Sequence, residues 1–114
     1  MDNPIQDKSF RFAVRIVNLC KYLQTEQKEY ILAKQLLRSG TSIGANVSEA
    51  QQAQSRPDFV NKLNIALKEA SETEYWLRLL YETDYLTKEQ FTSIFADCSE
   101  VKSMLVTIVK SSKN

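Results

Sequence analysis

The stretch from Gln35 to Glu49, QLLRSGTSIGANVSE, constrains the fold of this chain more than any other segment. Read at helical spacing, it places an apolar stripe on one side and a line of polar side chains on another. Small residues lie between the two, although a glycine inside a helix costs about 1 kcal/mol relative to alanine. Close approach of another backbone would offset that cost, so we expect a helix that is packed on more than one side. The apolar stripe comprises Leu32, Leu36, Ile43, Val47 and Ala50, and the small residues are Ser39, Gly40, Thr41, Gly44 and Ala45.

The polar line, here called the polar ladder, follows steps of four, four and three and consists of Arg38, Ser42, Asn46 and Glu49. This spacing stacks the four side chains along one side of a helix. If the polar ladder is buried, each of its polar groups needs a hydrogen-bonding partner. We expect the helix that carries it to run from about residue 28 to residue 54. A break into two pieces at Gly40 and Gly44 is the alternative.

The residue types that are present limit the chemistry available to the chain. With 114 residues it fits one domain, 1–114, and its formal net charge of +1 gives no global reason to expect a nucleic-acid or membrane partner. The sequence contains no histidine, the commonest general base and a frequent metal ligand. We therefore expect no enzymatic activity, no metal and no cofactor. Cys20 and Cys98 lie in apolar helical patterns and predict buried, reduced thiols, a disulfide being the alternative. Without a leader or a membrane-length apolar run, the sequence predicts a cytoplasmic location.

The first segment predicts a helix from about residue 4 to residue 24, capped by Asn3 and opened by a proline. Lys8, Arg11 and Arg15 form a basic line along it. A basic line of this kind is usually a solvated helix face. The alternative is a contact surface for phosphate groups or for an acidic partner.

Two further helices follow. Ser55 and Pro57 mark the start of the third helix. Thr87 and Gln90 form a capping box before the fourth helix. The fourth helix runs toward the C-terminus, with Lys110 and Lys113 near its end. The third carries a heptad pattern of Phe59, Leu63, Ala66, Ala70, Thr73, Leu77 and Leu80. The fourth carries a stripe of Phe91, Ile94, Phe95, Cys98, Val101, Leu105 and Ile108. Four amphipathic helices with short links predict an all-α, antiparallel up-down-up-down four-helix bundle.

The third helix also offers partners for the polar ladder. In a hairpin that turns near Ser55, Arg38 should meet the region of residues 72–74, and Glu49 should meet Lys62 or a neighbouring subunit. Glu69 and Glu72 could in principle hold a hard cation or perform acid–base chemistry, but their simpler role is to pair with Arg38 or Lys68. Because small residues flank the ladder, we expect the Arg38 pair to be buried, so that losing Arg38 would cost about 3–5 kcal/mol.

The third helix has more apolar surface than one stripe requires. Ile65, Trp76 and Leu79 lie outside its heptad pattern, which is more than a monomer normally exposes. This surplus predicts self-association, without a subunit number.

Three segments together resemble a known family. The runs QLLRSGTSIGANVSEA, SRPDF and KLNIALKEASETEYWLRLL closely resemble the bacterial four helix bundle family, also named for the 23S ribosomal RNA intervening-sequence protein. The family motif RS-x-x-SI-x-x-N-x-x-E is filled here by Arg38, Ser39, Ser42, Ile43, Asn46 and Glu49. The resemblance implies a four-helix bundle whose subunits form a ring, typically a homopentamer. It also implies a distant relation to the accessory variability protein of diversity-generating retroelements, whose basic pentamer works with a reverse transcriptase and nucleic acid.

The charge of this chain departs from that basic branch. Residues 1–56 carry eight Lys/Arg and five Asp/Glu, and residues 57–114 carry seven and nine, which gives about +3 and −2. A near-neutral surface supplies little of the phosphate neutralisation that drives nonspecific nucleic-acid binding. The leading hypothesis is therefore a non-catalytic homo-oligomeric scaffold or interaction protein, whose partner is itself. The alternative is an RNA- or DNA-binding accessory protein that acts through Lys8, Arg11 and Arg15.

Overall fold

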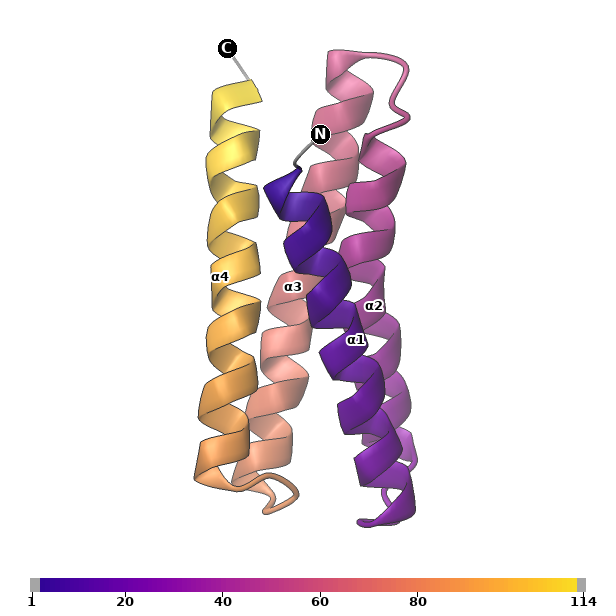
Figure 1. Ribbon diagram of the computed structural model, residues 1–114, viewed down its shortest axis with the longest axis vertical. Coiled ribbons are helices and arrows are strands. Elements are labelled where there is room, and N and C mark those ends of the chain that lie inside the picture. The colour runs from indigo at the N-terminus through magenta and orange to yellow at the C-terminus, as the bar shows by residue number, and fades with distance from the viewer. Residues whose placement is uncertain (1–2, 113–114) are drawn as a thin grey trace.

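The computed structural model describes residues 3–112, which form four α-helices and, within that range, no strand. Figure 1 shows the helices standing side by side along the 45 Å long axis, with both ends of the chain at the same end of the molecule. The expected all-α class with four helices is confirmed. The helices are α1 (Pro4–Thr25), α2 (Ile31–Ala50), α3 (Arg56–Glu82) and α4 (Lys88–Ser112). Lys113 lies outside the described residues.

Three of the four helices begin at the caps that the sequence predicts. The side-chain oxygen of Asn3 accepts a hydrogen bond from the backbone N–H of Gln6 at 3.2 Å, and Ser55 accepts one from Asp58 at 3.2 Å. The side-chain oxygen of Gln90 accepts a hydrogen bond from the backbone N–H of Thr87 at 2.9 Å, and the Thr87 hydroxyl accepts one from the backbone N–H of Gln90 at 3.1 Å. Each cap satisfies N–H groups that the first turn of a helix leaves without a helical partner.

The second helix is shorter than expected at both ends. The backbone of Lys28 has a φ of 55°, which is incompatible with a right-handed helix. Helix α2 starts after it, where the Glu29 carboxylate accepts the N–H groups of Leu32 and Ala33 at 2.6 and 3.0 Å. Residues 51–53 then form short turns that end the helix at Ala50. The expected range of 28–54 was therefore too long.

Helix α2 is nevertheless continuous through both glycines, so the alternative of a break there is wrong. A Cβ at Gly40 would lie 2.8 Å from side-chain carbons of Ile16 in α1, and one at Gly44 would lie 3.1 Å from the carbonyl oxygen of Ser9. Real Cβ atoms essentially never approach as closely as the first of these distances. The close approach of α1 thus explains both glycines: at Gly44 the neighbour is a backbone, as the sequence predicts, whereas at Gly40 it is the side chain of Ile16.

The core consists of inward stripes from all four helices. Every heptad position predicted for α3 is buried except Phe59, which is half-buried. On α2 the stripe is wider than predicted, because Ala33, Ser39 and Gly40 are buried as well, while Leu32 is half-buried. The largest fully buried side chains include Phe12, Ile16, Leu23, Leu36, Ile43, Leu63, Leu77, Leu80 and Leu105.

The four seams between helices are unequal. Consecutive helices pack against each other along their length, whereas α1 and α4 contact each other at far fewer positions. Along the α2–α3 seam, Arg38 meets Glu72 and Glu49 meets Lys62, so rising residue numbers in α2 meet falling numbers in α3. Within residues 3–112, no Cα atom of α1 lies within 8 Å of one of α3, and none of α2 within 8 Å of one of α4. The helices are therefore arranged in cyclic order, with the α1–α4 seam as its weakest side.

Candidate functional site

Arg38 joins α2 to two acids of α3 and is the centre of a polar cluster on the α2–α3 seam. Its guanidinium lies 3.2 Å from a carboxylate oxygen of Glu69 and also donates to Glu72. Glu72 accepts a further hydrogen bond from the indole N–H of Trp76 at 2.9 Å. These bonds, from Arg38 first and then Trp76, lower the pKa of the Glu72 carboxyl below its usual value of 4.5. The predicted meeting of Arg38 with an acid of α3 is confirmed.

The expected burial of this cluster is wrong for the single chain. The Arg38 side chain is 50% exposed, against 20% for Glu69 and 35% for Glu72. The small residues beside Arg38 do not shield its guanidinium from solvent, because Ser39 and Gly40 lie on the buried side of α2. The prediction that Arg38 meets the region of residues 72–74 also fails for one residue of that region, Glu74.

Glu74 lies on the side of α3 that faces α4, away from Arg38. Its carboxylate accepts hydrogen bonds from Lys102 and Ser99 of α4, at 2.9 and 3.1 Å. A residue two positions beyond Glu72 is rotated by about 200° around a helix with 3.6 residues per turn. That rotation explains why Glu74 faces α4 and Glu72 faces α2.

The remaining members of the polar ladder make shorter connections. The Ser42 hydroxyl donates to the carbonyl of Arg38 at 2.6 Å, and the Asn46 amide donates to the carbonyl of Ser42 at 2.8 Å. Both bonds stay within α2, so they satisfy the side chains without linking helices. Glu49 instead reaches Lys62 of α3 at 3.1 Å, as predicted. The polar ladder therefore fastens α2 to α3 at its two ends.

Ser39, the motif residue beside Arg38, has a different environment from the polar ladder. It is fully buried, and its hydroxyl lies 3.0 Å from that of Thr73 in the heptad pattern of α3. Thr73 also donates to the carbonyl of Glu69 at 2.8 Å. This buried polar link was not predicted, although a threonine within an otherwise apolar heptad pattern was the signal for it. It fixes how α2 and α3 sit against each other.

The basic line of α1 is paired within the chain. Lys8 lies 2.7 Å from a carboxylate oxygen of Glu100, and Arg15 lies 2.6 Å from one of Asp97. Arg11 pairs at 3.0 Å with Asp7, one turn earlier in the same helix. Glu100 above all, and Asp97, raise the pKa of Lys8. The three cations thus face carboxylates, and two of them hold α1 to α4.

The two cysteines are buried free thiols, as predicted. The Cys20 thiol donates to the carbonyl of Ala33 at 3.3 Å, and the Cys98 thiol to that of Ala70 at 3.6 Å. Burial raises the pKa of Cys20 to about 11 and that of Cys98 to about 12. Both are therefore protonated at neutral pH and play a packing role.

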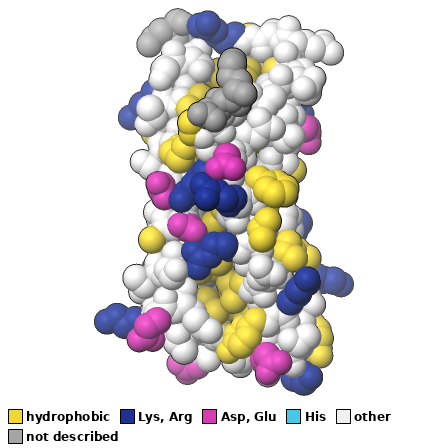
Figure 2. All heavy atoms as spheres, in the orientation of Figure 1, with side chains coloured by type: hydrophobic (Ala, Val, Ile, Leu, Met, Phe, Trp, Pro, Cys, Tyr) yellow, Lys and Arg dark blue, Asp and Glu magenta, His cyan; other side chains and the backbone are white. Residues whose placement is uncertain are grey.

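Several large apolar side chains lie exposed on two helices that are not adjacent in the bundle. On α1, Phe10 is 68% exposed and Val14 is 46% exposed. On α3, Tyr75 is 58% exposed beside the half-buried Leu79. On the face shown in Figure 2, hydrophobic side chains gather beside a band of charged ones. These exposed residues are candidates for contact with another molecule.

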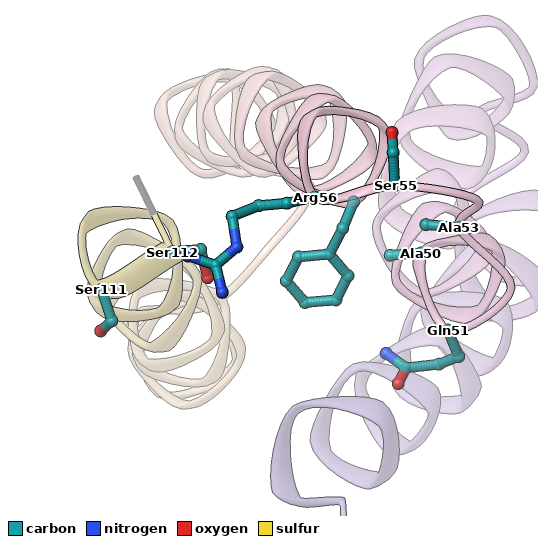
Figure 3. A pocket seen from close by; sticks show the side chains of 8 residues that line it. Ala50, Gln51, Ala53, Ser55, Arg56, Ser111 and Ser112 are labelled. Carbon is teal, nitrogen blue, oxygen red and sulfur yellow. The ribbon is translucent and has the colours of Figure 1, made fainter. Parts of the chain in front are cut away.

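A hollow lies at the end of the bundle where α2 ends and α3 begins. Its volume is about 430 Å³, and Figure 3 shows Arg56 extending across it from α3 toward Ser112 of α4. The side chains of Gln51 and Asn3 are already bonded to each other nearby, at 3.0 Å. The lining residues are Ala50, Gln51, Ala53, Ser55, Arg56, Phe59, Ser111 and Ser112. This mixture, without a paired acid and base, suggests no specific reaction.

Other sites of known type are few in the part of the chain that the structure describes. No group of three or more Cys, Asp or Glu residues in residues 3–112 could hold a metal ion. None of the helices in the same range has the length and apolarity that a bilayer-spanning helix needs. The Glu69 and Glu72 carboxylates share Arg38, so their arrangement is that of an ion-pair cluster.

Comparison with known proteins agrees with this architecture. The family model described as 23S rRNA-intervening sequence protein matches residues 1–107. A crystal structure of a protein of unknown function from the S23 ribosomal protein family of Bacteroides thetaiotaomicron is 64% identical, with a TM-score of 0.92. The match covers 93% of this chain and 98% of that one. A comparison with functionally curated proteins finds no match. The family match spans nearly the whole four-helix bundle, and the chain therefore belongs to the 23S rRNA-intervening sequence protein family.

Proposed function

We propose that this chain is a non-catalytic scaffold or interaction subunit that assembles with its own copies into a ring, with an up-down-up-down bundle as the building block. The observation that carries the proposal is the exposure of large apolar side chains on α1 and α3, headed by Phe10 and Tyr75. Apolar patches on a soluble protein mark surfaces that are covered by a partner. Ile31, 76% exposed at the start of α2, adds to this surplus.

The chemistry of the side chains supports a non-catalytic role. The sequence lacks histidine, and the polar ladder is used to join α2 to α3. The two thiols are protonated and buried, which suits a structural role in a reducing compartment such as the cytoplasm. The subunit number of five follows from the family resemblance alone.

Static light scattering of the purified chain over a dilution series tests the proposal. We expect a mass several times that of the 13.1 kDa subunit at micromolar concentration. A mass of one subunit throughout the series would refute self-association.

Binding of RNA or DNA through α1 is the competing proposal, and the geometry gives it less support. Lys8 and Arg15 would have to exchange the carboxylates of α4 for phosphates. A shift assay with structured RNA decides the question, because binding by phosphate contacts must weaken steeply as salt rises. We expect no binding at low salt. A complex that forms at low salt and dissociates as salt is added would instead favour the nucleic-acid role.

A further inference from the structure

We infer that copies of this chain associate head to tail, with the outer stripe of α1 in one copy docking on the outer stripe of α3 in the next. This inference rests on the proposed self-association and names the two surfaces that would carry it. The α1 stripe consists of Phe10, Val14, Val17 and Lys21, and the α3 stripe consists of Glu72, Tyr75, Leu79 and Glu82.

The α1 stripe is a continuous line on the outside of the bundle. Its members follow steps of four, three and four, so they stack along one side of the helix. Phe10 and Val14 are exposed and Val17 is half-buried, whereas the buried stripe of α1 lies at other positions, such as Phe12 and Ile16. The α1 stripe therefore presents apolar surface that the core does not use.

The α3 stripe has a matching shape. A hollow of about 220 Å³ is lined by Tyr75, Arg78, Leu79 and Glu82. A cavity of about 150 Å³ is already sufficient for benzene. The hollow can thus receive an aromatic ring, and Phe10 is the most exposed aromatic side chain among the large exposed residues.

The charges of the two stripes are complementary. The α1 stripe ends in the cation Lys21, which is exposed and has no ion pair among residues 3–112. The α3 stripe ends in the carboxylate of Glu82, which is exposed and has no ion pair among residues 3–112, whereas Glu72 at its other end is already paired with Arg38. Opposite charges at the edge of an apolar contact steer association and disfavour the pairing of like surfaces. A second copy of the chain offers both the apolar surface and the opposite charge.

The positions of the stripes decide the symmetry. Helices α1 and α3 are not adjacent, because each packs against α2 and α4 and no Cα atoms of the two lie within 8 Å among residues 3–112, so their outer faces belong to different sides of the bundle. A two-fold dimer joins the same patch on both subunits, whereas two different patches join head to tail and close into a ring when the rotation permits. The two-stripe arrangement therefore favours rings over pairs.

The test uses one blocking substitution in each stripe. Phe10→Asp places a charge in the α1 stripe, and Tyr75→Asp places one in the α3 stripe. Both residues are exposed, so the fold should survive, as circular dichroism can verify. If either aspartate variant fails to fold, Phe10→Ser or Tyr75→Ser takes its place. Ala96→Asp, an exposed position on α4 outside both stripes, is the matched control.

We expect the wild-type chain and Ala96→Asp to give the same oligomer mass, and each blocked variant alone to give a monomer. An equimolar mixture of the two blocked variants should form a heterodimer, because each retains the surface that the other has lost. The inference is overturned if either blocked variant keeps the wild-type mass, if Ala96→Asp also becomes monomeric, or if the mixture stays monomeric. A monomeric wild-type chain would refute the proposed function itself, whereas an oligomeric wild type with unaffected variants refutes only this choice of surfaces.

Discussion

The α2–α3 seam and the α1–α4 seam are held together in different ways. Between α2 and α3, small buried residues allow close packing, and the Ser39–Thr73 link lies inside the core. Between α1 and α4 the helices make few contacts, and Lys8 and Arg15 reach across to the carboxylates of Asp97 and Glu100 at the surface. A hollow of about 280 Å³ adjoins these ion pairs.

Position in the chain explains the difference. Helices α2 and α3 are joined by a short loop, so the chain itself brings their facing residues together. Helices α1 and α4 are the first and last of the bundle, and only side chains draw them together. Exposed ion pairs contribute about 0–1 kcal/mol each, whereas a buried aromatic side chain contributes several times as much. The stability of the α1–α4 seam should therefore depend more on the core beneath its ion pairs than on the ion pairs themselves.

The largest effect should come from the core under the α1–α4 seam. Phe12 is 1% exposed and lines the hollow beneath the ion pairs. Phe12→Ala should lower the free energy of unfolding by about 3–5 kcal/mol, because it removes a buried ring and leaves a cavity. Urea denaturation followed by circular dichroism measures this. Val14→Ala, two positions further along α1 and on its exposed side, is the control and should change the stability of the single chain little.

A smaller loss should follow from crowding the close approach of α1 and α2. Gly40→Ala puts a methyl group 2.8 Å from Ile16. Overpacking of this kind destabilises a fold by about 1–3 kcal/mol. The better helix propensity of alanine offsets up to about 1 kcal/mol of that loss. We expect a net destabilisation by thermal melting, and Ser48→Ala on the exposed side of α2 should have no such effect. A Gly40→Ala variant more stable than wild type would contradict the close packing of this seam.

Arg38→Ala should have a modest effect on the α2–α3 seam. The guanidinium is half exposed, so its loss from Glu69 and Glu72 should cost less than about 1 kcal/mol in the single chain. The measurement is the melting temperature of a monomeric background such as Phe10→Asp. A loss of several kcal/mol there would show that the expectation of a buried pair was right after all.

On the α1–α4 seam, Asp97→Asn should lower stability by only a few tenths of a kcal/mol at moderate salt. The substitution removes the shared partner of Lys8 and Arg15. Salt screens exposed charges, so the difference from wild type should shrink as sodium chloride is raised to molar concentration. A large difference that persists in high salt would mean that the ion pairs, and not the core, close this seam.

The smallest effect should be the pH dependence of the Glu72 carboxyl. Its pKa is lower in the folded chain than the usual 4.5, so the folded state binds its proton less readily than the unfolded state does. The stability that it contributes is present above pH 4.5 and is lost as pH falls through the lowered pKa. Unfolding free energies of wild type and Glu72→Gln should therefore converge below pH 4.5. A gap that widens on acidification would contradict this sign.

The features that neighbouring segments determine could be predicted from the sequence. The caps at Asn3, Ser55 and Thr87, the heptad pattern of α3 and the Glu49–Lys62 contact follow from local spacing and from the geometry of one hairpin. Arg38 could be placed opposite the acids of α3 for the same reason, although its burial could not, because exposure depends on what surrounds a helix on all sides.

The partners of the basic line could not be predicted in the same way. Lys8 and Arg15 meet residues of α4 that follow about 80 to 90 positions later in the chain, so no local spacing relates them. Both ends of α2 were missed because the left-handed Lys28 before it and the turns after Ala50 are set by the loops, whose polar residues are also compatible with a helix.

Native mass spectrometry of the wild-type chain tests most directly the claim that two different surfaces join copies head to tail. The account predicts one closed species that contains at least three copies of the 13.1 kDa subunit, with five copies expected from the family resemblance. A spectrum that contains only one or two copies would contradict it, because a head-to-tail ring cannot close with fewer than three.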